Sequence, residues 1–553
     1  MSQPPTTLFV NGNIFLSGVT PGVNAGLHRL PTFAEALLVR GDKIEYVGPE
    51  NDSVVAAARA EAGTVVRDLQ GKTLLPGFVD GHMHLMIMGQ SLNKLDLGKC
   101  KTLVDIQTTI REYAAANPDA PRVLCRGWMH SMTPGKVTAK DLDGLDGEKD
   151  RPILIDTKDL HTAWCNTAGI KELGAESWAD VPGGTIERDA DGKVTGVFNE
   201  AANITYVWPY LARVATMEER TEAIKSAVEA YHEAGYTGLI DMAMDQGAWD
   251  ALQALRAEGS IPMRIAAYWL IKPGKDDEEN LAQVEQAIEL AKVYNAETTP
   301  DCRIVGVKVI CDGIIDACTA GLTEPYSHND HLEVPLWTFQ QLEPVVKRAN
   351  EAGLQVALHA IGDATIKVVV DVLTAHVTPG RRPRVEHLEL ANEAEVARLG
   401  QGNITASIQP VHADPAILRA WPKLIGEHRC GRAFAYRELS DAGAPLALGS
   451  DAPTAPHTPL GNVYVGTTRR SYREQEYEAT VNPHFALGLC EAVAAGTEGA
   501  AYSCFDDQRI GVLKVGYKAD FVVVDMVWEK EQLKNAKVTE TWYDGAKVWE
   551  ATR

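Results

Sequence analysis

Strand-like and helix-like stretches alternate through the middle of the chain, and this rhythm constrains the fold more than any other feature. Short apolar stretches such as "TGLIDMA", "RIVGVKVICDG" and "LQVALHAIGD" are separated by helical patterns such as "FQQLEPVVKRANEAG". Strands that alternate with helices form βα units and a parallel sheet. With the stretch at residues 78–82 included, eight such strands can be counted, which predicts a closed (β/α)8 TIM barrel rather than an open sheet.

Both ends of the chain carry short alternating strands with Gly-containing turns between them, such as "TLFVNGNIF" near the start and "GVLKVGYKADFVVVD" near the end. At 553 residues the chain exceeds the roughly 250–300 residues of a single core. We therefore predict a small β-sandwich domain built from residues 1–75 and 505–553, with the barrel at 76–504. Residues at about 89–201 break the βα rhythm and are predicted to form an insertion after barrel strand 1.

Two histidines, His82 and His84, end the first barrel strand in "LLPGFVDGHMHL". Side chains at i and i+2 of a strand point the same way, so these imidazoles can converge on one metal ion. The pair also falls at the carboxyl end of a strand, where barrel enzymes place their chemistry. Alone the pair is a weak signal, because His-x-His occurs by chance in ordinary chains.

Four further strand ends supply residues that fit a metal site. Lys308 follows "RIVGV", His359 ends "LQVAL", His387 ends "RPRVE" and Asp451 ends "LALGS". In a barrel these ends form one ring, so residues far apart in sequence can share a site. Histidines with a carboxylate are the ligands of zinc and similar divalent ions. A single such His is more often a packed core residue, but here several coincide in chain order.

The motifs that carry a family resemblance run through nearly the whole chain. They include "PGFVDGHMHL", "DLHTAWCN", "GGTIERDADGKVTGVFNE", "GVKVICDG", "HAIGDAT", "RVEHLEL", "SIQPVHA", "GSDAPT" and "GYKADFVVVD". The sequence resembles the amidohydrolase superfamily, and within it the family 3 group of YtcJ-like metal-dependent hydrolases that includes N-substituted formamide deformylases.

The resemblance implies a binuclear metal centre, most simply with two Zn²⁺ ions. It implies that His82 and His84 bind one ion, that His359 and His387 bind the other, and that Lys308 bridges both as a carbamate. It also implies that Asp451 is the remaining ligand and the catalytic acid/base.

The substrate is less constrained, because the chain departs from the group's usual pattern. It reads "DGIIDACTAGL" after the lysine strand and "DLH" in the insertion. Aromatic and His residues of the insertion either line the pocket or pack its core. The candidate substrate-binding residues are Trp128, His161, Trp164, Asp312 and His412, the last as a contact to substrate or oxyanion.

The resulting functional hypothesis is hydrolysis of a C–N amide-type bond in an N-acyl or N-formyl amine, with a metal-activated water as nucleophile. Asp451 would take the water proton and pass it to the leaving nitrogen. The same site could instead open a lactone, ester, carbamate or cyclic amide. A different class of hypothesis is a catalytically silent regulatory homologue that keeps the barrel. Zinc-dependent nucleic-acid deamination is disfavoured, because the Pro-Cys-x-x-Cys signature is missing.

Composition narrows the partners and the compartment. The net charge of −22 disfavours nucleic acid, whose binding relies on Lys and Arg. The chain has no run of about 18 apolar residues, so we expect no membrane-spanning helix. The start, "MSQPPTTLFVNGNIF", lacks a leader pattern, so we expect no export. Nine cysteines without a Cys-x-x-Cys pair indicate neither a disulfide framework nor a thiolate zinc site. We expect a cytoplasmic protein with a small-molecule substrate that forms a homo-oligomer, a dimer.

Overall fold

Eight parallel strands form the central sheet, so the predicted barrel is confirmed. The computed structural model describes residues 5–16, 31–158, 162–181, 184–200, 202–259 and 261–552. Nearly every residue of these strands is buried, as expected for a parallel sheet covered on both faces. In spatial order the strands are β8 (Phe78–Met83), β15 (Tyr236–Met244), β16 (Arg264–Ile271), β17 (Cys302–Ile310), β18 (Gln355–Ala360), β19 (Arg384–His387), β20 (Thr405–Ile408) and β21 (Leu446–Leu448).

The first and last barrel strands meet at two glycines. A Cβ atom on Gly81 would lie 2.5 Å from the carbonyl oxygen of Leu448, and a Cβ on Gly449 would lie 2.4 Å from the backbone nitrogen of His82. Just beyond this contact the backbone N–H of Asp451 donates to the carbonyl of His82 at 2.7 Å. The glycines therefore let β8 and the end of β21 approach closely enough to bring two predicted ligand segments together.

Helices follow the strands in βα order. Helix α9 (Phe339–Glu351) shows how they are specified. Thr338 and Gln341 form a capping box at its start. Apolar residues such as Leu342, Val345 and Val346 repeat at helical spacing and are buried. The main helices after β8 and its insertion are α6 (Met217–Ala234), α7 (Gln246–Glu258), α8 (Asp277–Val293), α9 (Phe339–Glu351), α10 (Asp363–His376), α11 (Glu393–Gln401), α14 (Tyr436–Asp441), α15 (Pro459–Thr468), α16 (Leu489–Ala494) and α17 (Ala500–Ser503).

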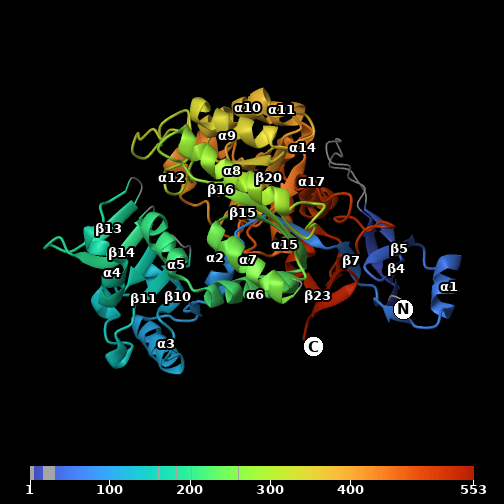
Figure 1. Cartoon of the computed structure of the whole chain (residues 1–553), viewed down its shortest axis with the longest axis horizontal. Coiled ribbons are helices and arrows are strands. Elements are labelled where there is room, and N and C mark those ends of the chain that lie inside the picture. The colour runs from blue at the N-terminus through green and yellow to red at the C-terminus, as the bar shows by residue number, and fades with distance from the viewer. Residues whose placement is uncertain are drawn as a thin grey trace. The chain divides into compact units, whose positions relative to one another are not determined.

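Strands from the two chain ends share one sheet, as predicted (Figure 1). Its order is β24 (Ala546–Glu550), β23 (Lys537–Tyr543), β22 (Phe521–Asp525), β7 (Thr73–Pro76), β2 (Asn13–Leu16) and β3 (Thr32–Ala34). The companion sheet contains β5 (Lys43–Gly48), β4 (Ala36–Arg40), β1 (Thr6–Val10) and β6 (Thr64–Asp68). The rings of Phe9, Phe521 and Trp542 lie 5.1–5.5 Å apart and join the two ends of the chain in one core; Phe521 stacks on Trp542, and Phe9 meets both edge to face.

A second compact unit comprises residues 86–227 and 246–254, and the predicted insertion lies within it. Its sheet runs β13 (Gly184–Arg188), β14 (Val194–Glu200), β12 (Thr162–Cys165), β11 (Ile153–Thr157), β10 (Val123–Trp128) and β9 (Leu95–Asp96). Its helices are α2 (Leu85–Leu92), α3 (Leu103–Ala116), α4 (Thr167–Leu173) and α5 (Trp208–Val214). Within the described ranges no helix is both long and apolar enough to cross a membrane.

Candidate metal centre

Five of the six predicted ligands lie at strand ends that meet in one place. The Nε2 atoms of His84 and His82 are 3.0 and 3.4 Å from Oδ1 of Asp451. The ring of His387 lies 4.8 Å from that of His82 and 4.4 Å from that of His359. The barrel thus assembles residues that are up to 369 positions apart in the chain, as the strand-end argument predicts.

Two of these residues depend on an unusual backbone conformation. His387 has φ of 78° and Asp451 has φ of 57°, values that residues other than glycine rarely adopt. In a regular strand Glu386 and His387 would point to opposite faces. Because the chain turns at His387, both of them reach His82. Such local strain is typical of functional sites.

Asp451 and the two histidines of β8 form a group that fits a divalent ion. One ligand atom from each of His82, His84 and Asp451 lies within 4.8 Å of the others. Burial would raise the pKa of Asp451, but His82 and His84 hold it well below its ordinary value, so the carboxylate stays ionised. Nδ1 of His84 and Nδ1 of His387 are buried without a hydrogen-bond partner. The donor set and these unpaired nitrogens both fit a bound metal ion.

A buried carboxylate fixes the ring of His82. Nδ1 of His82 is 2.8 Å from Oε2 of Glu386. Burial and the charge of Lys308 lower the pKa of His82 to about 4, so the ring is neutral near pH 7. Burial would raise the pKa of Glu386, but Arg384 and His82 hold it well below its ordinary value. The neutral ring therefore donates from Nδ1 to Glu386 and presents the lone pair of Nε2 towards Asp451.

A second carboxylate ties the end of β8 to the turn that carries Asp451. Asp80 accepts hydrogen bonds from the backbone N–H of Ser450 at 2.8 Å, from its hydroxyl at 2.6 Å, and from the hydroxyl of Tyr231 at 2.9 Å. Burial raises the pKa of Asp80 to about 6. No role was predicted for Asp80 from the sequence.

Lys308 is buried on β17, with 2% of its surface exposed. Burial lowers the pKa of its ammonium, and the charges of Glu386 and Asp451 oppose that shift. The lysine therefore gives up its proton more readily than a surface lysine would.

Asp312 lies just beyond β17 and is fully buried. Its carboxylate accepts hydrogen bonds from the backbone N–H groups of Gly321, Ile361 and Gly362 at 2.9–3.1 Å. Its Oδ1 is also 3.2 Å from Nε2 of His359. Asp312 thus holds together the loops around His359, and its predicted contact with substrate stays a prediction that this geometry does not support.

His412 follows β20 and faces the same site. Its Nε2 is 3.6 Å from Oδ2 of Asp451, and its ring stacks on His387 at 5.8 Å. Its Nδ1 is 3.3 Å from Oε1 of Glu389, which raises the pKa of His412 against the effect of burial. Glu389 was missed by the sequence analysis, although it stands two residues after His387. His387, Glu389 and His412 form a second group that could hold a metal ion.

The predicted insertion residues lie in the core of the second unit. Trp128 and Trp164 are fully buried, with ring centroids 5.1 Å apart, and the indole N–H of Trp164 donates to the carbonyl of Thr138 at 2.9 Å. This arrangement is explained by packing, so their role as substrate contacts remains a prediction. His161 lies outside the described residues.

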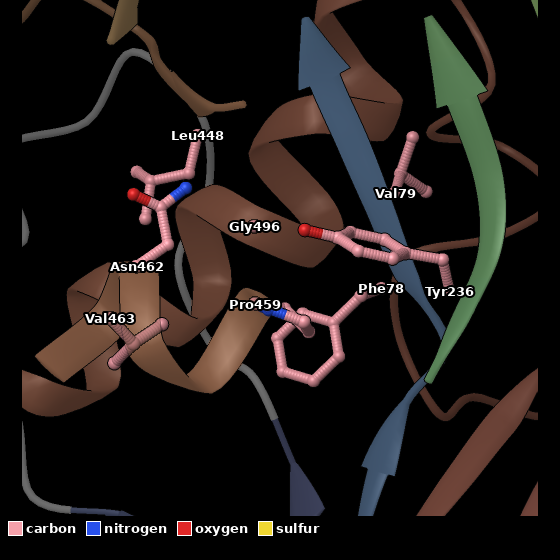
Figure 2. Close-up of a pocket in the computed structure, with 8 residues that line it drawn as sticks. All are labelled: Phe78, Val79, Tyr236, Leu448, Pro459, Asn462, Val463 and Gly496. Atoms are coloured by element: carbon pink, nitrogen blue, oxygen red, sulfur yellow. The ribbon is translucent and has the colours of Figure 1, made fainter. Parts of the chain in front are cut away.

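A small cavity lies between barrel strands and α15 (Figure 2). Its volume is about 10 Å³, room for roughly one water molecule. The hydroxyl of Tyr236 points into it. It is too small to take a substrate. Its lining residues are Phe78, Val79, Tyr236, Leu448, Pro459, Asn462, Val463 and Gly496.

The fold and the site define an α/β-barrel protein with a His/Asp group suited to a metal ion. A family model described as amidohydrolase family matches residues 65–549. The chain therefore belongs to the amidohydrolase family, which confirms the resemblance seen in the sequence.

Two relatives and one solved structure extend this comparison. The chain is 27% identical over 540 residues to YtcJ of Bacillus subtilis (strain 168), named as an amidohydrolase, covering 94% of this chain and 98% of that one. It is 24% identical over 551 residues to the N-substituted formamide deformylase of Arthrobacter pascens, covering 94% and 95%. A crystal structure of an uncharacterized metal-dependent hydrolase from Pyrococcus horikoshii OT3 shares the fold, with a TM-score of 0.76, 24% identity, and coverage of 95% and 98%.

Proposed function

We propose that this protein is a metal-dependent hydrolase that cleaves a C–N amide-type bond in a small N-acyl or N-formyl amine. The observation that carries the proposal is the ionised carboxylate of Asp451, 3.0 and 3.4 Å from Nε2 of His84 and His82. Membership of the amidohydrolase family supports hydrolysis. The relative named as an N-substituted formamide deformylase supports the C–N bond of an amide as the bond that is cleaved.

His82 and His84 would hold one ion, and His359 and His387 a second. We propose Zn²⁺ for both, with Lys308 between them as a carbamate. The neutral amine is the form of lysine that adds to carbon dioxide, and the burial of Lys308 favours that form. When bound, such ions lower the pKa of water towards about 7 and polarise a carbonyl group.

Asp451 carries the proton in this mechanism. Its carboxylate accepts one proton from the attacking water while the new C–O bond forms, and then donates that proton to the leaving nitrogen as the C–N bond breaks. The amine leaves neutral and the acyl group leaves as the acid, so atoms and charge balance. We propose that His412, whose Nε2 is 3.6 Å from Oδ2 of Asp451, donates a hydrogen bond to the substrate.

Two measurements on purified protein test the proposal. Elemental mass spectrometry should find about two divalent ions per chain. A substrate panel of N-formyl and N-acyl amines should show turnover that is lost on treatment with a chelator and restored by Zn²⁺. Turnover of lactones, esters, carbamates or cyclic amides alone would change the bond assignment. Protein with no stoichiometric metal and no turnover would favour a regulatory role instead.

A further inference from the structure

Arg384 on β19 is an unusual residue for the inside of a barrel, where branched apolar side chains normally pack. It has no exposed surface. Its guanidinium donates to the carbonyl of Gly81 at 2.6 Å, to the hydroxyl of Ser407 at 2.9 Å, and to the hydroxyl of Ser503 at 2.7 Å. β8 and β19 are not neighbours in the sheet, so this side chain reaches across the barrel.

The remaining bonds of Arg384 go to Glu386, two residues along the same strand. Nε donates to Oε1 at 2.8 Å and Nη2 donates to Oε2 at 3.1 Å, a fork-like pairing that fixes the carboxylate plane. The same Oε2 accepts the proton of His82 Nδ1 at 2.8 Å. Arg384, Glu386 and His82 thus form a continuous buried chain, here called the Arg384 network, that ends at a predicted metal ligand.

Stability alone does not explain this arrangement. A buried ion pair is commonly no more stabilising than apolar side chains of similar volume, because both charges lose their hydration. The barrel could fill this space with Leu or Met. What apolar side chains cannot do is hold the proton of His82 on Nδ1 and turn Nε2 towards Asp451, as histidine ligands of metals require.

We propose that Arg384 and Glu386 are positioning residues for the metal centre, and that they set the ring orientation of His82 and its affinity for the ion. This inference rests on the proposed function only in assuming that His82 binds a metal, and it does not depend on the substrate. Arg384 orients Glu386, and Glu386 orients His82. The hydroxyls of Ser407 and Ser503 accept further hydrogen bonds from Arg384.

The test is the Zn²⁺ dissociation constant of the full chain, measured by competition with a chelator. Glu386→Gln keeps the size of the side chain but removes the charge, and it should weaken Zn²⁺ binding about 10–100-fold. The matched control is Glu491→Gln. Glu491 is a buried carboxylate paired with Arg437 in another part of the molecule, so this variant should bind Zn²⁺ like the wild type.

A double variant separates positioning from structural support. Arg384→Met with Glu386→Leu removes both charges together and leaves no unpaired buried charge, so it should lower the melting temperature of the metal-free protein less than Arg384→Met alone. Zn²⁺ binding should nevertheless fall at least as far as in Glu386→Gln. If Glu386→Gln does not fold, Ser407→Ala, which removes one bond to Arg384 and no charge, should show a smaller loss of affinity.

The outcomes distinguish the two proposals. Wild-type affinity for Zn²⁺ in both Glu386→Gln and the double variant would overturn the positioning role. A wild-type chain that binds no Zn²⁺ would overturn it together with the metal assignment. Weakened binding in Glu386→Gln, combined with no turnover of any amide by the wild type, would uphold the positioning role and reject only the proposed reaction.

Discussion

Two histidines of the site present a defined nitrogen because a buried carboxylate holds each ring. Glu386 faces Nδ1 of His82, and Asp312 faces Nε2 of His359. These contacts leave Nε2 of His82 facing Asp451, 3.4 Å away. At the scale of single residues, buried carboxylates therefore orient the rings of the predicted ligands.

Asp451→Asn separates chemistry from binding. Asn is nearly isosteric and keeps an oxygen that can face a metal, but it cannot accept and return a proton near pH 7. We expect metal content to be at least partly retained, substrate KM to change little, and kcat to fall about 10²–10⁴-fold. Steady-state kinetics and metal analysis on one preparation check this. A lower melting temperature with normal kcat per folded molecule would show that Asp451 has only a structural role in its turn, and would contradict its role as acid/base.

Lys308→Ala tests the proposed carbamate. Removing the side chain should lower metal occupancy and activity, because the proposed bridge would be lost and a space left in its place. Short carboxylic acids such as acetate or propionate, added during metal loading, should partly restore both by supplying a carboxylate. An increase in metal content with acid concentration is the measurement, with Lys423→Ala, a surface change, as control. Full metal occupancy without added acid would contradict the bridge.

At the scale of elements, the closure of the barrel depends on glycine. Gly449→Ala would place its Cβ 2.4–2.9 Å from backbone and side-chain atoms of His82. Since backbone cannot move aside easily, we expect a loss of about 1–3 kcal/mol in the free energy of unfolding, and weaker metal binding. Gly431→Ala is the control, because its nearest neighbour lies 3.9 Å away. Urea unfolding of both variants measures the difference. Equal midpoints would mean that β8 and the end of β21 can move apart without loss of stability.

The sequence predicts the elements well because their signals are local. The alternation of strands and helices lies within short windows, and His82, His84, His359, His387 and Asp451 each stand at a strand end. The partners of those ligands could not be predicted in the same way. Glu386 bonds to His82 across 304 positions of sequence, and nothing near either residue indicates that pairing.

Aromatic residues of the insertion show a second limit of prediction from the sequence, which concerns substrate contacts. Trp128 and Trp164 have the same sequence signature whether they line a pocket or fill a core. Their full burial is explained by packing, and the sequence could not show it. Asp312 is similar, since an acid after a strand can bind substrate or bond to loop backbone, and its three N–H partners come from other segments.

At the scale of the whole molecule, Arg264 joins the barrel to the strands of the chain's end. This buried residue on β16 donates to Asp520 at 2.6 and 3.1 Å and to Asp544 at 2.7 Å, and it also pairs with Asp301. The contact ties the terminal sheet and the barrel into the one compact unit that contains both.

Arg264→Ala should therefore be strongly destabilising. It leaves the buried carboxylate of Asp520 without its cation, which commonly costs about 3–5 kcal/mol. Arg419→Ala removes a half-exposed pair with Glu474 and should cost about 0–1 kcal/mol. Chemical unfolding of the two variants under the same conditions measures the difference. Equal losses would show that the Arg264 contacts add no more than a surface pair.

The pairing of β7 with β22 has a consequence for synthesis of the chain. Pro76 lies opposite Phe521, so β7 can pair with β22 only after about 445 further residues have been synthesised. At about 5–20 residues per second, a ribosome needs roughly 20–90 s to make that partner. During this time the apolar edge of β7 has no native neighbour from β22, which makes the nascent chain a natural client for chaperones that shield unpaired strands.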